Sequence, residues 1–118
     1  MTKYAKLGLL LLLTSTALTG CSTPPSMYHW GSYEEQIYAT YAEPGKISPD
    51  QQLADLEKDF QIMQASNSAP PPGFHAHLGY LYFQSGKTDR ALQAFETEKK
   101  LYPESKVYMN RLIARLPH

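Results

Sequence analysis

Few residues in this 118-residue chain have the types and spacings that carry out chemistry. Cys21 is the only cysteine, so it has no partner for a disulfide and no second thiol for a metal site. His75 and His77 are two residues apart, and on a helix they point to different faces, so they cannot chelate one metal together. We expect these histidines to be either hydrogen-bonded within the protein or solvated. Glu96 and Glu98 diverge in the same way, and we expect both at a solvated surface.

Motifs for catalysis or cofactor binding are absent from the sequence. There is no G-x-S-x-G, no H-E-x-x-H, no glycine-rich phosphate loop and no CxxC. We therefore expect no catalytic residue, no metal, no small-molecule substrate and no diffusible cofactor. The sequence predicts that this protein is not an enzyme.

The first twenty residues have the layout of a secretory signal. Lys3 and Lys6 precede an apolar run over residues 7–13, and small residues follow it. The run is well short of the roughly 20 apolar residues that a membrane-spanning helix needs, and the chain has no second run of this kind. We expect residues 1–20 to be a cleaved signal peptide.

The stretch LTGC, residues 18–21, resembles the lipobox of bacterial lipoproteins. This resemblance implies cleavage before Cys21 and covalent attachment of diacylglycerol, with fatty acids such as palmitate, to the Cys21 thiol. Ser22 stands where an aspartate usually signals retention in the inner membrane, which resembles the outer-membrane pattern. We therefore expect a lipid anchor in the bacterial outer membrane, with the protein facing the periplasm; exposure at the cell exterior stays open. The alternative is a plain secreted protein with an incidental cysteine.

Net charge argues against nucleic acid as a partner. Removal of Lys3 and Lys6 leaves nine basic and eleven acidic side chains of the original eleven of each, a net charge of −2. The chain has no basic run that could follow a phosphate backbone. The 98 residues left after the first 20 of 118 are removed suffice for one domain with a modest core.

The pattern of the mature chain is all-α, with about five helices. We expect a tether over residues 21–31 and a helical domain over residues 32–118. Its first helix would run from Tyr33 to Ala42, after a capping box of Ser32 and Glu35. Its apolar stripe is expected to comprise Tyr33, Ile37 and Tyr41.

A second helix is predicted to run to about Ala65. Ser48 is its expected N-cap, Pro49 suits its first position, and Gln51 would complete another capping box. Its apolar residues recur at steps of three and four: Leu53, Leu56, Phe60 and Met63. The proline-rich stretch over residues 66–73 predicts a loop.

Residues 72–105 predict two antiparallel helices separated by Gly86. This segment resembles a tetratricopeptide repeat, a helix pair of about 34 residues with a fixed order of large and small positions. The matching residues are Leu78, Gly79, Tyr82, Ala91, Phe95 and Pro103. Glu98 departs from the pattern, because the repeat prefers a small residue there, and we expect loose packing on that side. Residues 106–116 predict a final capping helix, with Met109, Leu112 and Leu116 on its inner face.

The first helix of this pair offers a candidate protein-binding face. By the repeat register, its outward residues are Ala76, Tyr80, Phe83 and Gln84. Tyr80 and Phe83 are three residues apart, so they are neighbours and present a rigid apolar surface for a peptide or helix. The alternative is that a flanking helix of this same chain covers them.

A second aromatic cluster, residues 28–33, contains Tyr28, Trp30 and Tyr33. Three interpretations are open. It could be a binding hot spot for a partner, because Trp and Tyr are enriched in such sites. It could be an anchor at the membrane interface, because Trp30 is nine residues from Cys21. It could also be an internal staple that closes the amino-terminal end of the helix stack, which is the interpretation we favour.

The segment MYHWGSYEEQIYATY, after a lipobox and before a repeat-like helix pair, is similar to a family of small bacterial lipoproteins classed as domain of unknown function 4810. Members are typically encoded beside a lipoprotein similar to the curli secretion channel, which implies a shared envelope assembly. Our leading hypothesis is a non-enzymatic, lipid-anchored adaptor that holds an envelope protein, such as a channel-forming lipoprotein. The alternative is a structural envelope component that binds peptidoglycan or self-assembles.

Overall fold

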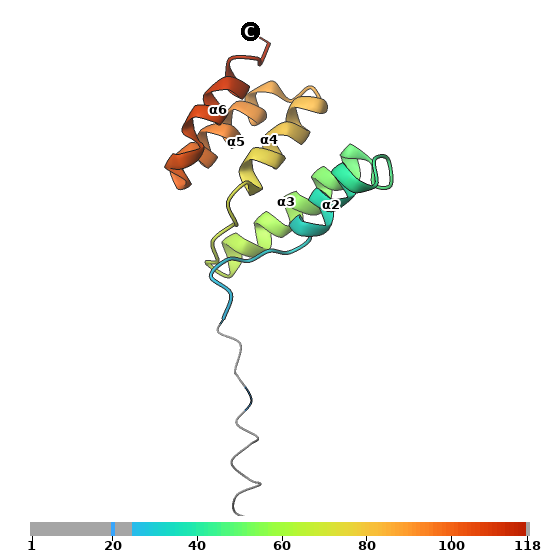
Figure 1. The fold of residues 1–118 in the computed structure, drawn as a ribbon, viewed down its shortest axis with the longest axis vertical. Helices are drawn as coiled ribbons and strands as arrows, with labels where there is room; N and C mark the ends of the chain where they lie inside the picture. The colour runs from blue at the N-terminus through green and yellow to red at the C-terminus, as the bar shows by residue number, and fades with distance from the viewer. Residues whose placement is uncertain (1–19, 21–24, 118) are drawn as a thin grey trace, which may run out of the picture.

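The computed structural model describes Gly20 and residues 25–117 of the chain, and within them it contains five α-helices and no strand (Figure 1). They are α2 (Tyr33–Ala42), α3 (Pro49–Ala65), α4 (Phe74–Gln84), α5 (Thr88–Leu101) and α6 (Lys106–Ile113), with the 3-10 turn η2 (Pro103–Ser105) before the last. The all-α prediction is confirmed, and the helices begin and end close to the predicted residues. Residues 1–19 of the predicted signal peptide, and Cys21, lie outside the described residues.

The helices form two groups that meet at α4. α2 and α3 are antiparallel and lie beside each other, and α4, α5 and α6 follow as a second layered group (Figure 1). α4 packs on both α3 and α5, and α6 packs on α5. One continuous hydrophobic core joins the groups, with Leu56, Met63, Phe74, Leu81 and Met109 among its most buried members. No helix within the described residues is long and apolar enough to cross a membrane.

The start of α2 differs from the predicted capping box. Ser32 makes no side-chain cap to its own helix. Instead, its amide and its hydroxyl both donate to Oδ2 of Asp59 on α3, at 2.7 and 2.6 Å. A carboxylate is a stronger acceptor than a neutral backbone or side-chain group, so the tertiary partner takes both donors of Ser32. The capping-box prediction for Ser32 and Glu35 was therefore wrong.

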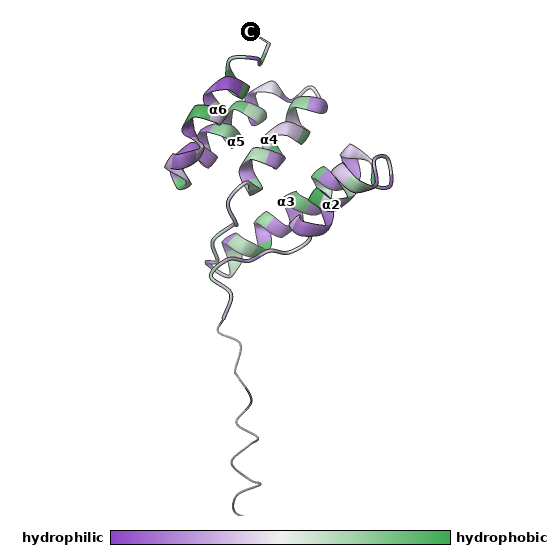
Figure 2. Cartoon of the chain, in the orientation of Figure 1, coloured by the Kyte–Doolittle hydropathy of each residue, from purple (hydrophilic) through white to green (hydrophobic). Residues whose placement is uncertain are grey.

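The inner face of α2 also differs from the predicted stripe. Gln36 and Ala39 are its buried residues, whereas Tyr41 is exposed. Polar side chains join α2 to α3: Thr40 donates to Oε1 of Gln52 at 3.0 Å, and Gln36 donates to Oδ2 of Asp55 at 3.2 Å. Hydrophilic residues accordingly run along both helices (Figure 2). This interface depends on hydrogen bonds more than on apolar packing. The inner face of α2 therefore does not follow the apolar stripe that the sequence predicted.

The predicted start of α3 is confirmed in its main feature. The Ser48 hydroxyl accepts from the Gln51 amide at 3.2 Å, and Pro49 occupies the first turn. The Gln51 side chain does not complete a capping box, because it donates to Asp55 at 2.9 Å instead. A Ser N-cap and a Pro in the first turn together favour a helix that begins at this residue.

Close approach of α4 and α5 depends on Gly79. A Cβ at this position would lie 2.6 Å from Cε1 of Phe95, which is shorter than any normal carbon contact. Ala91 on α5 is fully buried, and Leu78 and Tyr82 fill the space beside it. The prediction that small residues let the two helices pack tightly is confirmed.

Glu98 corrects a prediction about this same helix pair. Its side chain is only 2 % exposed, and its carboxylate accepts from the amides of Gly73, His75 and Ala76 at 2.7, 3.1 and 3.3 Å. These donors belong to the first turn of α4, where the N-cap Gly73 has no side chain to satisfy them. Burial raises the pKa of Glu98, and the three amide bonds act in the opposite direction. Glu98 is therefore a buried cap for α4, and the expectations of a solvated and loosely packed site were wrong.

Candidate protein-binding site

The four predicted residues of α4 occupy one face of the helix, and three of them are exposed. Tyr80 and Phe83 are 42 % and 43 % exposed, Gln84 is exposed, and Ala76 is half-buried. The side-chain amide of Gln84 (Nε2) donates to the Tyr80 hydroxyl at 2.8 Å, which orients the phenol along the helix. The structure therefore presents two large aromatic side chains to solvent from a rigid helix.

A hollow of about 160 Å³ adjoins this face, between α4 and α6. Its walls come from three helices and the turn after α6. The lining residues are Tyr80, Phe83, Phe95, Leu112, Arg115 and Leu116. α6 thus lies beside Tyr80 and Phe83 without covering them. The alternative interpretation, that a flanking helix of this same chain covers these two residues, is therefore met only in part. Sequence analysis did not include Phe95, Leu112, Arg115 and Leu116 in the site, although the shared face of Leu112 and Leu116 was a signal.

The second predicted cluster packs largely inside the domain. Tyr28 forms a β-bridge with Ala69, and the His29 amide donates to the Ala69 carbonyl at 3.0 Å. The Tyr28 ring meets the Tyr102 ring edge-on, with centroids 6.4 Å apart. These contacts attach the residues before α2 to the proline-rich loop and to the end of α5, as an internal staple would.

Tyr33 and Trp30 complete this cluster. Tyr33 packs against Phe74 of α4 with ring centroids 5.7 Å apart, and burial raises the pKa of Tyr33 to about 12. Trp30 stacks on the outer side of Tyr33, with centroids 6.3 Å apart, and stays exposed. The indole therefore lies at the edge of the staple, where it is open to solvent.

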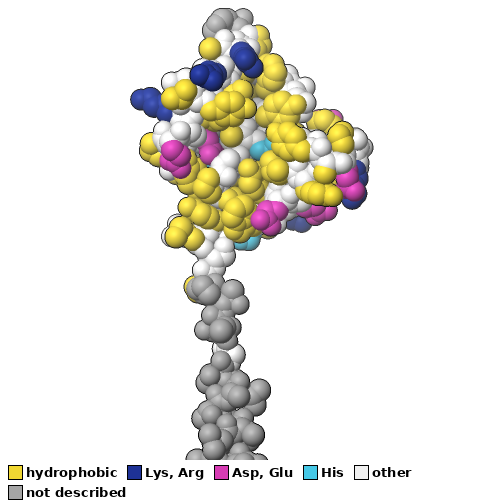
Figure 3. Space-filling model, viewed as in Figure 1, with side chains coloured by type: hydrophobic (Ala, Val, Ile, Leu, Met, Phe, Trp, Pro, Cys, Tyr) yellow, Lys and Arg dark blue, Asp and Glu magenta, His cyan; other side chains and the backbone are white. Residues whose placement is uncertain are grey.

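His77 joins the two predicted sites, which the sequence treated as separate. Its ring lies 6.3 Å from that of Tyr33, and it stacks on Tyr80 at the same distance. Trp30, Tyr33, His77 and Tyr80 consequently form a continuous row of rings, which we call the aromatic row. Hydrophobic side chains are also spread widely over the face of the domain seen in Figure 3. The row links the residues before α2 to the hollow beside α6.

Both core histidines are buried, so the expectation that they might be solvated was wrong. His75 lies edge-on to Phe60, with centroids 5.1 Å apart, whereas His77 belongs to the aromatic row. Burial lowers the pKa of each to about 4. Nε2 of His77 has no hydrogen-bond partner among the described residues. Both imidazoles are therefore neutral at pH 7, and they point to different sides of α4 as predicted.

A larger and more polar hollow of about 500 Å³ lies on the other side, between α3 and α5. Glu57 holds one end of it, because its Oε1 accepts from the Tyr82 hydroxyl at 2.7 Å and pairs with Arg90 at 2.9 Å. Burial is the main cause that raises the pKa of Tyr82 to about 12. The charged groups at this end are thus already paired with one another.

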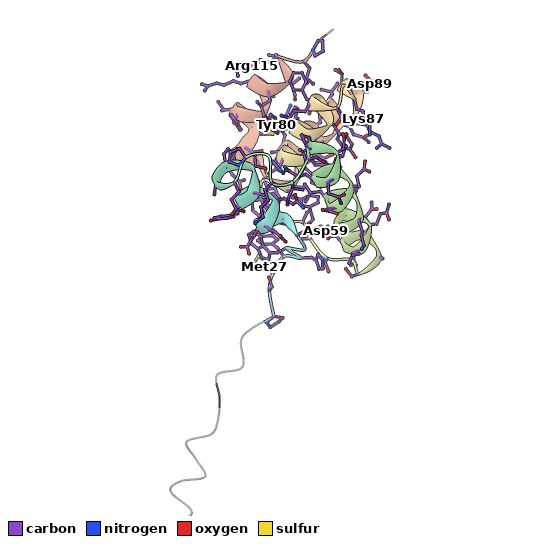
Figure 4. All side chains as sticks on the ribbon, turned by 90° about the vertical axis from the view of Figure 1, so that its right-hand side faces the viewer. Met27, Asp59, Tyr80, Lys87, Asp89 and Arg115 are labelled. Atoms are coloured by element: carbon purple, nitrogen blue, oxygen red, sulfur yellow. The ribbon has the colours of Figure 1, made fainter. Side chains whose placement is uncertain are left out.

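No group of three or more His, Cys, Asp or Glu side chains in residues 25–117 could hold a metal ion. Met27, which follows the predicted tether, lies at one end of the described domain, whereas Tyr80 and Arg115 lie toward the other (Figure 4). Tyr80 is therefore separated from Met27 along the domain (Figure 4).

Comparison with known proteins places the chain in a family. No curated protein and no solved structure matches the chain. Residues 27–112 match the family described as domain of unknown function (DUF4810), which covers the aromatic row and all but the end of the hollow. Because this match spans well over half of the 118 residues, the chain belongs to the DUF4810 family.

Proposed function

We propose that this chain is a non-enzymatic, lipid-anchored adaptor on the periplasmic side of the bacterial outer membrane. Lipid on Cys21 would fix it to the bilayer, since each buried CH₂ contributes about 0.8 kcal/mol and two or three acyl chains together make dissociation slow. The helical domain would hold a protein partner. The lipobox-like LTGC sequence supports the anchor, and the exposed face of α4 supports the binding role.

The observation that carries the binding role is the exposure of Tyr80 and Phe83 beside an apolar hollow. Most hydrophobic residues of α4 are buried in the core, yet these two large rings are more than 40 % exposed on a rigid helix. Clustered aromatic residues beside a pocket are typical of binding hot spots. These side chains lose little conformational entropy on binding, because each is carried by an ordered helix and has only two torsion angles (χ1 and χ2) to restrict.

The helix pair α4–α5 followed by α6 supports a further part of the proposal, a single tetratricopeptide-like repeat with a capping helix. Gly79 and Ala91 occupy the small positions of that repeat and are buried between the helices. Such repeats commonly present the first helix of each pair to a partner segment. In this reading α4 is the presenting helix, and α6 closes the stack.

We infer an envelope protein as the partner, such as a channel-forming lipoprotein similar to the curli secretion channel. This inference comes from the genomic neighbourhood typical of similar lipoproteins. The separation of Tyr80 from Met27 supports it, because a partner bound at Tyr80 would lie away from the residues that lead to Cys21. A partner embedded in the same membrane could then be held by its periplasmic part.

Mild cross-linking in intact cells tests the proposal. The full chain and the Tyr80→Ala/Phe83→Ala variant are recovered from the envelope with their cross-linked neighbours, which are identified by mass spectrometry. Truncation of two hot-spot residues at more than 1 kcal/mol each should reduce partner recovery by about tenfold or more. The same spectra report whether Cys21 carries lipid.

A matched control uses exposed apolar side chains that do not line the hollow. Ile62 on α3 and Leu92 on α5 are 43 % and 40 % exposed, so an Ile62→Ala/Leu92→Ala variant removes comparably exposed apolar side chains. Its partner recovery should equal that of the unchanged chain. Unchanged recovery from a folded Tyr80→Ala/Phe83→Ala variant, judged by circular dichroism, would remove this face from consideration.

A further inference from the structure

The hollow beside α6 has the size of one large apolar side chain. It measures about 160 Å³, and every lining residue except Arg115 is aromatic or aliphatic. An apolar cavity of about 150 Å³ in another protein stays dry and binds benzene. Because Tyr80 and Phe83 at its mouth are exposed, an occupant can enter from solvent. The geometry favours a single ring or branched aliphatic side chain over a long acyl chain.

Arg115 is the one charged residue that lines the hollow, and α6 with the turn after it carries basic but no acidic side chains. α6 and the turn after it carry Lys106, Arg111 and Arg115, all exposed, and residues 105–117 include no Asp or Glu. The ion pairs found among the described residues involve Lys46, Arg90 and Lys99. Within that part of the chain, therefore, no ion pair joins a carboxylate to Lys106, Arg111 or Arg115.

Arg115 differs from the other two cations in its position. Arg111 lies in the last turn of α6, where a cation is favoured by the helix dipole. Arg115 lies beyond Ile113, the last residue of α6, and forms part of the wall of the hollow. A guanidinium there can bind a carboxylate with two parallel hydrogen bonds, which a small apolar ligand alone would not use.

We propose that this hollow binds a protein segment in which a large apolar side chain stands beside an acidic residue. The apolar side chain fills the space between Tyr80, Phe83 and Leu112, and the carboxylate pairs with Arg115. Gln84 and Arg115 then form the polar rim of an apolar pocket, the usual anatomy of a protein interface. This inference rests on the proposed adaptor function, since it names the chemistry of the partner at the same face.

Fluorescence anisotropy with synthetic peptides tests the inference. The full chain is reconstituted in nanodiscs of neutral phosphatidylcholine and titrated into three dye-labelled decapeptides. Each has a central phenylalanine, flanked by glutamates, by glutamines or by lysines. The glutamate peptide should bind about fivefold more tightly than the glutamine peptide, as expected for an ion pair of about 1 kcal/mol, and the lysine peptide should bind weakest. Replacing the phenylalanine by alanine should abolish binding.

Two variants of the chain assign the preference to Arg115. Arg115→Gln should bind the glutamate and glutamine peptides equally, whereas Arg111→Gln, which changes a similar charge outside the hollow, should keep the preference. Equal binding of the two peptides to the unchanged chain, no binding of any peptide, or a preference that survives in Arg115→Gln would each overturn the inference. A concentration-dependent dimer that Phe83→Ala abolishes would assign the hollow to a second copy of this chain and overturn it too.

The two proposals fail in different ways. Suppose that the peptides show no preference but the Tyr80→Ala/Phe83→Ala variant loses its cross-linked neighbour. The adaptor function would then remain supported, and the proposed preference for an acidic partner segment would be refuted. Suppose instead that the peptides bind as expected while neighbour recovery is unchanged. The proposed binding preference of the hollow would then remain supported, and its role in the adaptor function would be refuted.

Discussion

The Gly73 amide at the start of α4 donates a hydrogen bond of 2.7 Å to Oε1 of Glu98, which lies 25 residues later on α5. Glu98 also accepts two further amides of the same helix turn. The Glu98 side chain of α5 thus caps the start of α4, where Gly73 has no side chain that could do so. This contact aligns the start of α4, and with it the aromatic residues that α4 carries.

Replacing Glu98 by alanine should destabilise the domain. The change leaves three amides in the first turn of α4 without an acceptor, in a site that is buried, and we expect a loss of about 3 kcal/mol in the free energy of unfolding. Urea denaturation followed by circular dichroism measures it. Glu98→Gln keeps one acceptor oxygen and should lose less.

Glu96→Ala is the matched control for Glu98. Glu96 lies on the same helix, is exposed and pairs only with Lys99 at 2.9 Å. Surface pairs of this kind contribute about 0–1 kcal/mol, so this variant should unfold almost as the unchanged chain does. If Glu98→Ala were equally mild, the buried carboxylate would contribute no net stability, and the small residue that the repeat prefers would serve as well.

Enlarging Gly79 should strain the α4–α5 interface. An alanine Cβ would come 2.6 Å from the Phe95 ring, so either the ring or the helix must move. Overpacking of this kind costs about 1–3 kcal/mol. Thermal unfolding of Gly79→Ala should show a lowered Tm. Combining it with Phe95→Leu, which shortens the opposing side chain, should recover part of the loss; a strictly additive double variant would contradict the contact.

The features that sequence analysis predicted well are local. The starts and ends of the helices follow from the Ser48–Pro49 pair, the prolines of residues 70–72 and the Gly86 break, which act on the backbone of their own neighbourhood. The tight α4–α5 contact followed from Gly79 because only a residue without a side chain fits there. Such signals need no knowledge of the rest of the molecule.

The features that sequence analysis missed depend on contacts between residues far apart in the chain. Asp59 takes the donors of Ser32, and Glu98 caps another helix; both look like ordinary surface acids within their own helices. His77 links Tyr33 to Tyr80 only because α2 packs beside α4. The two candidate sites were therefore predicted separately, and their union as one aromatic row needed the tertiary structure.

Removing the charge of Asp59 should loosen α2. Both donors of Ser32 depend on one carboxylate oxygen, and the remaining links between α2 and α3 are polar. In Asp59→Asn a neutral amide replaces it, so we expect the amides of α2 to exchange with deuterium about five- to tenfold faster, which corresponds to about 1 kcal/mol of local stability. Asp50→Asn, an exposed acid at the start of α3, is the control. Equal exchange of α2 in both variants would show that the contact between Ser32 and Asp59 does not stabilise α2.

The buried histidines should make the domain sensitive to mild acid. Burial lowers the pKa of His75 and of His77 from 6.5 to about 4, so the unfolded chain binds more protons between these values. Stability is therefore complete above pH 6.5 and falls as the pH drops toward 4. Between pH 7 and pH 5 each histidine should contribute a loss of about 2 kcal/mol. Urea denaturation at several pH values measures the slope.

His77→Phe separates the contribution of one histidine. A phenyl ring can keep the stacking on Tyr33 and Tyr80 but binds no proton, and it also removes Nε2, which lacks a partner among the described residues. The loss of stability between pH 7 and pH 5 that the two buried histidines cause should then fall to about half, because only His75 of this pair remains. An unchanged slope would mean that His77 is protonated without cost in the folded protein, and that the aromatic row opens to admit water.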